Sequence, residues 1–151
     1  MKWINGLFVA LGVLFLLSQF LRPELSNRPV DPKRQLHAPA NVQAILDRSC
    51  ADCHSSQTHW PWYANVSPLS WWLADHVKAG RSEINFSNFP TTPANRAAHK
   101  MEEVCEQVEK GEMPIREYLW MHRSAGLSAA DKQTICTWAK GEQTRLLAAA
   151  P

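Results

Sequence analysis

The chain has 151 residues, a formal net charge of +2 and four cysteines. Acidic and basic residues alternate along it without a Lys/Arg block, so no nucleic-acid-binding surface is expected. Apart from an apolar N-terminal segment, roughly 115 residues remain, which is enough for one domain with one core and too few for two.

The N-terminal segment, residues 1–21, is almost uninterruptedly apolar after Lys2. About twenty such residues are needed to cross a bilayer as a helix, so we expect a single N-terminal transmembrane anchor. A cleaved signal peptide is the alternative. We favour the uncleaved anchor because no small-x-small cleavage site follows the apolar run.

Residues 22–40 follow this segment and contain four prolines among polar side chains. Such composition favours an extended backbone. We therefore expect a Pro-rich tether that joins the anchor to a domain over residues 41–148.

The remaining chain shows helical periodicity and no convincing period-two alternation, which predicts an all-α fold. The expected helices have recognisable boundaries. A short helix leads into Cys50, a second follows Ser67-Pro68 and ends near Gly80, a third begins near Thr92-Pro93 and ends at Gly111, and a fourth follows Ser128.

The first of these helices delivers the motif Cys50-Ala51-Asp52-Cys53-His54. C-x-x-C-H is the attachment motif of a c-type haem, in which two thiols bind the vinyl groups and the adjacent imidazole binds iron. A bare C-x-x-C also suits a redox dithiol or half of a zinc site. The adjacent His54, and the lack of a second cysteine pair at similar spacing in the sequence, favour one covalently bound haem c.

His54 would fill one axial position of the iron, and the sixth ligand decides the chemistry. Met113 is the first candidate because it lies in a loop between Gly111 and Pro114, ahead of the last helix. Core filling is the commoner role of a methionine. His122 is the alternative sixth ligand and would give a lower reduction potential.

Aromatic side chains are concentrated between residues 60 and 72. Indole rings usually belong to the core, but a haem also needs apolar walls, and this cluster begins six residues after His54. Trp60, Trp62 and Trp71 are therefore candidate haem contacts.

The other two cysteines, Cys105 and Cys136, lie on or beside the apolar faces of the third and fourth helices. On the outer side of a membrane, two unused thiols pair more often than they stay free. We expect a structural disulfide that joins the two helices.

Several of these segments resemble the small bacterial haem-binding domain family. The resemblance covers residues 40–142 and is carried by the C-x-x-C-H motif, the run from Trp60 to Leu73, and Gly111-Glu112-Met113-Pro114 with His122. Family members are membrane-anchored or secreted single-haem c-type cytochromes, which implies a small cytochrome c-like helical domain, haem binding and electron transfer. A second proline often follows Met-Pro in the family, where this chain has Ile115.

The sequence thus predicts a membrane-tethered electron carrier for unidentified redox partner proteins, rather than an enzyme. Basic residues after position 21 favour a cytoplasmic domain. Attachment of c-type haem in bacteria takes place outside the inner membrane, however, so we expect a single-pass inner-membrane protein with its haem domain facing the periplasm. A haem-based sensor or small-ligand-binding module with an open sixth site, and an accessory haem subunit of a membrane complex, stay open as alternatives.

Overall fold

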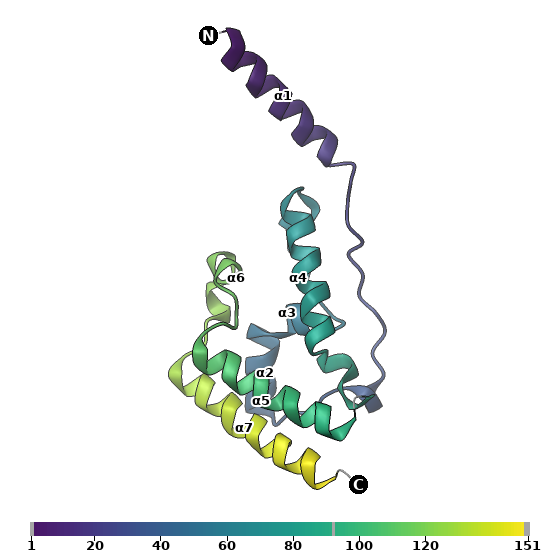
Figure 1. Ribbon diagram of the computed structural model, residues 1–151, viewed down its shortest axis with the longest axis vertical. Coiled ribbons are helices and arrows are strands. Elements are labelled where there is room, and N and C mark those ends of the chain that lie inside the picture. Colours follow the sequence, from purple (N-terminus) through teal and green to yellow (C-terminus); the bar gives the residue numbers. More distant parts are fainter. Residues whose placement is uncertain (1, 92, 150–151) are drawn as a thin grey trace.

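The computed structural model describes residues 2–91 and 93–149. All regular structure in these residues is helical, which confirms the predicted all-α class (Figure 1). The α-helices are α1 (Lys2–Ser18), α2 (Ala40–Ser49), α3 (Ala51–His54), α4 (Leu69–Glu83), α5 (Ala94–Lys110), α6 (Arg116–Met121) and α7 (Ala129–Ala148). Short 3-10 turns are η1 (Pro32–Arg34), η2 (Trp62–Asn65), η3 (Phe86–Thr91) and η4 (Arg123–Ala125).

Helices α5 and α7 pack against each other along much of their lengths (Figure 1). Their buried side chains recur at helical spacing: Met101, Cys105 and Val108 from α5, and Ile135, Cys136 and Ala139 from α7. A disulfide joins Cys105 to Cys136, the pair that the sequence suggested. Burial of these two faces creates the layer against which α2 packs.

The ends of α5 and α7 follow their local sequence signals. Gly111 ends α5 in the left-handed conformation with a φ of 71°, which a glycine adopts without a steric penalty. Ser128 caps α7, because its hydroxyl accepts the Asp131 N–H and the Asp131 carboxylate accepts the Ser128 N–H. The chain between these two caps carries Met113 and α6.

The segment over residues 22–40 is extended but lies along the domain rather than apart from it. Asn27 and Thr58 exchange two hydrogen bonds of 2.9 and 3.0 Å. The Leu36 N–H donates to the Phe86 carbonyl, and its side chain is buried beside Phe89 and Met101. Packed structure therefore begins ahead of residue 41.

No described helix is long and apolar enough to cross a membrane. Helix α1 has 17 residues, a rise of about 25 Å against a hydrocarbon core of about 30 Å. It ends at Ser18, and the side chain of the next residue, Gln19, pairs with the backbone of Ser67 through two hydrogen bonds. This finding overturns the expected transmembrane anchor and the expected single-pass inner-membrane location with a periplasmic haem domain.

Candidate functional site

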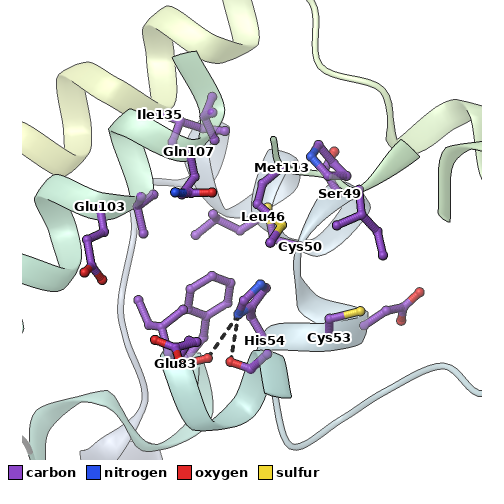
Figure 2. Close-up of a pocket in the computed structure, with 18 of the residues that line it drawn as sticks. Leu46, Ser49, Cys50, Cys53, His54, Glu83, Glu103, Gln107, Met113 and Ile135 are labelled. Atoms are coloured by element: carbon purple, nitrogen blue, oxygen red, sulfur yellow. Dashed lines mark hydrogen bonds between the residues drawn. The ribbon is translucent and has the colours of Figure 1, made fainter. Parts of the chain in front are cut away.

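A cavity of about 480 Å³ lies between the helices that surround the C-x-x-C-H motif. Cys50, Cys53, His54 and Met113 all line it, although Met113 comes from a distant part of the sequence (Figure 2). The walls are mainly apolar side chains from α2, α5 and α7, among them Leu46, Val104, Val108 and Ile135. The structure thus gathers the predicted iron ligands and haem-attaching cysteines at one site.

The two motif cysteines are free thiols, with Cys50 at the N-cap of the short helix α3 and Cys53 within it. Burial, reinforced by the nearby Cys53, raises the pKa of Cys50 from 9.0 to about 12. Burial and the Asp52 carboxylate raise the pKa of Cys53 from 9.0 to about 11. Both groups are therefore protonated thiols at neutral pH.

His54 is held in one orientation by the end of α4. Its Nδ1 lies 3.0 Å from the Gly80 carbonyl oxygen and 3.2 Å from the Ile84 carbonyl oxygen (Figure 2). Carbonyl oxygens only accept hydrogen bonds, so Nδ1 carries the proton and donates it. Burial lowers the pKa of the imidazole, which keeps it neutral. The lone pair of Nε2 is left available for a metal.

Gly80 has a second role, because α3 and α4 touch at this residue. A Cβ atom added to Gly80 would lie 2.7 Å from the Cys53 carbonyl oxygen. Only glycine permits this approach of the two backbones. Gly80 had been predicted near a helix end, but α4 continues to Glu83.

Met113 reaches the cavity from the loop after α5. The N–H groups of Glu112 and Met113 both donate to the Gln107 carbonyl, at 3.0 and 3.2 Å, so the left-handed turn at Gly111 is closed onto α5. The Met113 side chain is 37% exposed and lies across the cavity from His54 (Figure 2). A thioether placed there suits the second axial position of a haem iron.

The alternative ligand His122 is engaged elsewhere and is not among the described residues that line the cavity. Its Nε2 lies 2.7 Å from the Tyr63 hydroxyl. Its ring stacks on Tyr118 with centroids 4.2 Å apart and an interplanar angle of 7°. Both the ring face and Nε2 of His122 are occupied in this structure, so Met113 is the better placed candidate and His122 stays the alternative.

The three tryptophans predicted to contact haem are also absent from the described cavity lining. Trp60 packs against the cluster around Tyr63, Leu73 and Val77. Trp62 is 74% exposed, and Trp71 Nε1 donates to the Leu21 carbonyl, 2.6 Å away. Trp60 thus lies at the α4 end of the core and Trp71 at the junction with the N-terminal segment, and contact of these rings with haem stays a prediction.

Sequence reasoning missed several residues that form the site. Tyr118 lines the cavity and donates a 2.7 Å hydrogen bond to Asp52, inside the C-x-x-C-H motif. The Phe86 ring centroid lies 5.9 Å from that of His54. No sequence motif marks these two residues.

A second group of potential metal ligands does not form a competing site. Ligand atoms of Cys105, Glu109 and Cys136 lie within 4.8 Å of one another. Both sulfurs are bound in the disulfide, and a metal requires thiolates.

The cavity therefore offers the donor set of a haem site: two free thiols, a neutral imidazole with an available Nε2, a thioether opposite, and apolar walls. No curated protein and no solved structure matches this chain significantly. The sequence pattern of the haem-binding domain family matches residues 13–141, which is most of the chain. The protein therefore belongs to the haem-binding domain family.

Proposed function

We propose that this protein is a single-haem c-type cytochrome that attaches haem covalently and transfers single electrons. The observation that carries the proposal is the meeting of Cys50, Cys53, His54 and Met113 at one largely apolar cavity. The bound haem would supply a one-electron ferrous/ferric couple.

Cys50 and Cys53 would hold the haem covalently. Each S–H group would add across one vinyl C=C bond, with the sulfur bonded to one carbon and the hydrogen to the other. No atom is lost and no external oxidant is needed. Cys50 and Cys53 are free for this addition because neither belongs to a disulfide.

His54 and Met113 would hold the iron from its two faces. The hydrogen bonds from His54 Nδ1 to two carbonyls fix the ring and increase the basicity of Nε2. A methionine ligand favours ferrous iron and therefore raises the reduction potential. If both residues held the iron, no position would be open to a small ligand, and electron transfer would be favoured over ligand binding.

The test is optical and near-infrared spectroscopy of the haem-loaded protein, its Met113→Ala variant and a Met121→Ala control. Met121 is exposed and is not among the described cavity residues. We expect the wild type and M121A to be low-spin with a methionine-to-ferric-iron charge-transfer band. M113A should lose this band, become high-spin and show a lower reduction potential.

Two other results would decide against this assignment. If M113A is indistinguishable from the wild type, Met113 is not the ligand and His122→Ala becomes the next variant. If the wild type is already high-spin, the sixth site is open and the sensor or ligand-binding function replaces electron transfer. Release of haem on denaturation would exclude thioether attachment.

A further inference from the structure

The end of the cavity away from the cysteines carries charged side chains. Glu83 of α4 and Glu103 of α5 lie on one side of the cavity, and Cys53 lies on the other (Figure 2). The Lys100 ammonium joins the two glutamates, with Nζ 2.9 Å from Glu83 and 2.7 Å from Glu103. Lys100 is the one Lys or Arg among the described residues that line the cavity.

The substituents of haem are placed in a way that matches this arrangement. Its two vinyl groups and its two propionates lie at opposite edges of the macrocycle. A haem whose vinyl groups are bound to Cys50 and Cys53 therefore directs its propionates towards the far end of the cavity. There, Glu83 and Glu103 are repulsive for a carboxylate, and Lys100 is attractive.

We propose that Lys100 binds a haem propionate and gives up its contact with Glu83 to do so; this assignment rests on the proposed attachment through the cysteines. An ammonium has three N–H donors, and the two glutamates account for two of them, so the third donor and the one that Glu83 releases serve the two oxygens of one propionate. The Glu83 side chain is 71% exposed, so it turns into water at little cost. The Lys100 side chain is only 21% exposed and stays at the cavity.

This exchange would also change what links α4 to α5. In the structure the link beside the cavity is the ion pair between Glu83 and Lys100. With haem in place, Cys50, Cys53 and His54 would hold it beside α3, which contacts α4, and Lys100 on α5 would hold its propionate. The cofactor then connects the two sides of the cavity directly.

The experiment compares mesohaem with mesohaem dimethyl ester. Mesohaem carries ethyl groups in place of vinyls, so it binds reversibly without any change to the cysteines, and the ester lacks both propionate charges. Each is titrated into the full-length apo protein as wild type, Lys100→Gln, Lys100→Arg and Lys110→Gln. Lys110 is the matched control, because it lies on the same helix, pairs with a glutamate and is not among the described cavity residues.

We expect the wild type to bind mesohaem more tightly than its ester. In K100Q the ratio of these two affinities should be about tenfold smaller, which corresponds to the loss of one charge-assisted hydrogen bond. K100R and K110Q should keep the wild-type ratio. An unchanged preference in K100Q, with its helicity by circular dichroism equal to that of the wild type, would overturn the assignment. If K100Q loses helicity, K100R decides instead. Should K100R keep its helicity but lose the preference for mesohaem over the ester, a role for the positive charge would be contradicted.

Covalent attachment is measured separately, as retention of ordinary haem by denatured wild type. If the wild type retains ordinary haem and K100Q prefers mesohaem over the ester as strongly as the wild type does, the role of Lys100 is rejected and the cytochrome function stays intact. Failure of the wild type to retain ordinary haem would reject the attachment on which the orientation rests. The absence of any mesohaem binding by the wild type would reject both.

Discussion

At the scale of single residues, the end of α4 fixes the orientation of His54. The Gly80 carbonyl already accepts the Ile84 N–H, and the Gly80 and Ile84 carbonyls both face His54 Nδ1. This arrangement fixes the tautomer and points the Nε2 lone pair away from these two carbonyls. Because burial lowers the pKa of His54, a proton does not compete with a metal for this nitrogen at neutral pH.

The motif thiols give a prediction at the same scale. Folding raises the pKa of Cys50 to about 12 and that of Cys53 to about 11. At pH 8, iodoacetamide should therefore alkylate Cys53 about 100-fold and Cys50 about 1000-fold more slowly in the native apo protein than in the guanidinium-unfolded one, because the thiolate is the reactive species. Mass spectrometry under non-reducing conditions follows both sites, and the disulfide protects Cys105 and Cys136.

The same pKa shifts predict how the stability of the apo protein changes with pH. As pH rises above about 9, thiols of the unfolded chain lose protons before the native ones do, so the apo protein should become less stable until about pH 12. A Cys50→Ala/Cys53→Ala variant should show a smaller decrease in stability over this pH range.

For the alkylation experiment, equal rates in native and unfolded protein would contradict the burial of these thiols.

At the scale of helices, the contact between α3 and α4 decides whether the attachment motif is presented correctly. Local sequence predicted a helix that contains Gly80 but placed the residue at its end, because glycine commonly terminates helices. Its role instead depends on a backbone 27 residues earlier, at Cys53. A close approach between two helices leaves no signal in the pattern of either one.

Gly80→Ala tests this contact. The new Cβ would lie 2.7 Å from a backbone oxygen, so α3 and α4 must separate. We expect a decrease of about 1–3 kcal/mol in the free energy of unfolding and less covalently bound haem per chain. Both are measured by urea denaturation and by haem absorbance after purification.

Gly141→Ala is the matched control, because it also lies within a helix but has no atom within 4 Å of its added Cβ. It should stabilise the protein by about 1 kcal/mol, the usual gain for alanine over glycine in a helix. Wild-type stability and haem content in G80A would show that the two helices are not as close as described here.

At the scale of the whole molecule, the sequence predicted what depends on local pattern and on motif spacing. The all-α class, the caps of α5 and α7, and membership of a haem-binding family follow from such signals. The position of the aromatic side chains could not be predicted in this way, since proximity to His54 along the chain does not say which face of α4 the rings cover. Trp71 lies against the N-terminal segment, a contact between residues 50 positions apart.

Arg81 explains why the segment over residues 22–40 belongs to the domain. Its guanidinium donates to the Ser55 carbonyl at 2.7 Å, the Ser26 carbonyl at 3.0 Å and the Thr58 hydroxyl at 2.9 Å. The side chain thus joins α4, the loop after His54 and the extended segment. Proline content predicted the extended backbone but carried no information about these partners.

Two deletions separate the parts of the N-terminal region. Removal of residues 2–18 takes away α1, whose side chains from residue 3 to 17 are exposed, and should leave the free energy of unfolding nearly unchanged. Removal of residues 2–37 also takes away the buried Leu36 and the partners of Arg81 and Thr58. Loss of a buried leucine alone costs about 2–5 kcal/mol, so this deletion should be destabilising by at least that amount.

Urea denaturation of the two deletion variants and of full-length Leu36→Ala provides the measurement. L36A should account for part of the loss in the longer deletion, and the remainder belongs to the hydrogen bonds made by the segment, each about 1 kcal/mol. Equal midpoints for the two deletions would mean that residues 19–37 add no stability. That result would restore the segment to a free tether, and the packed domain would begin at α2.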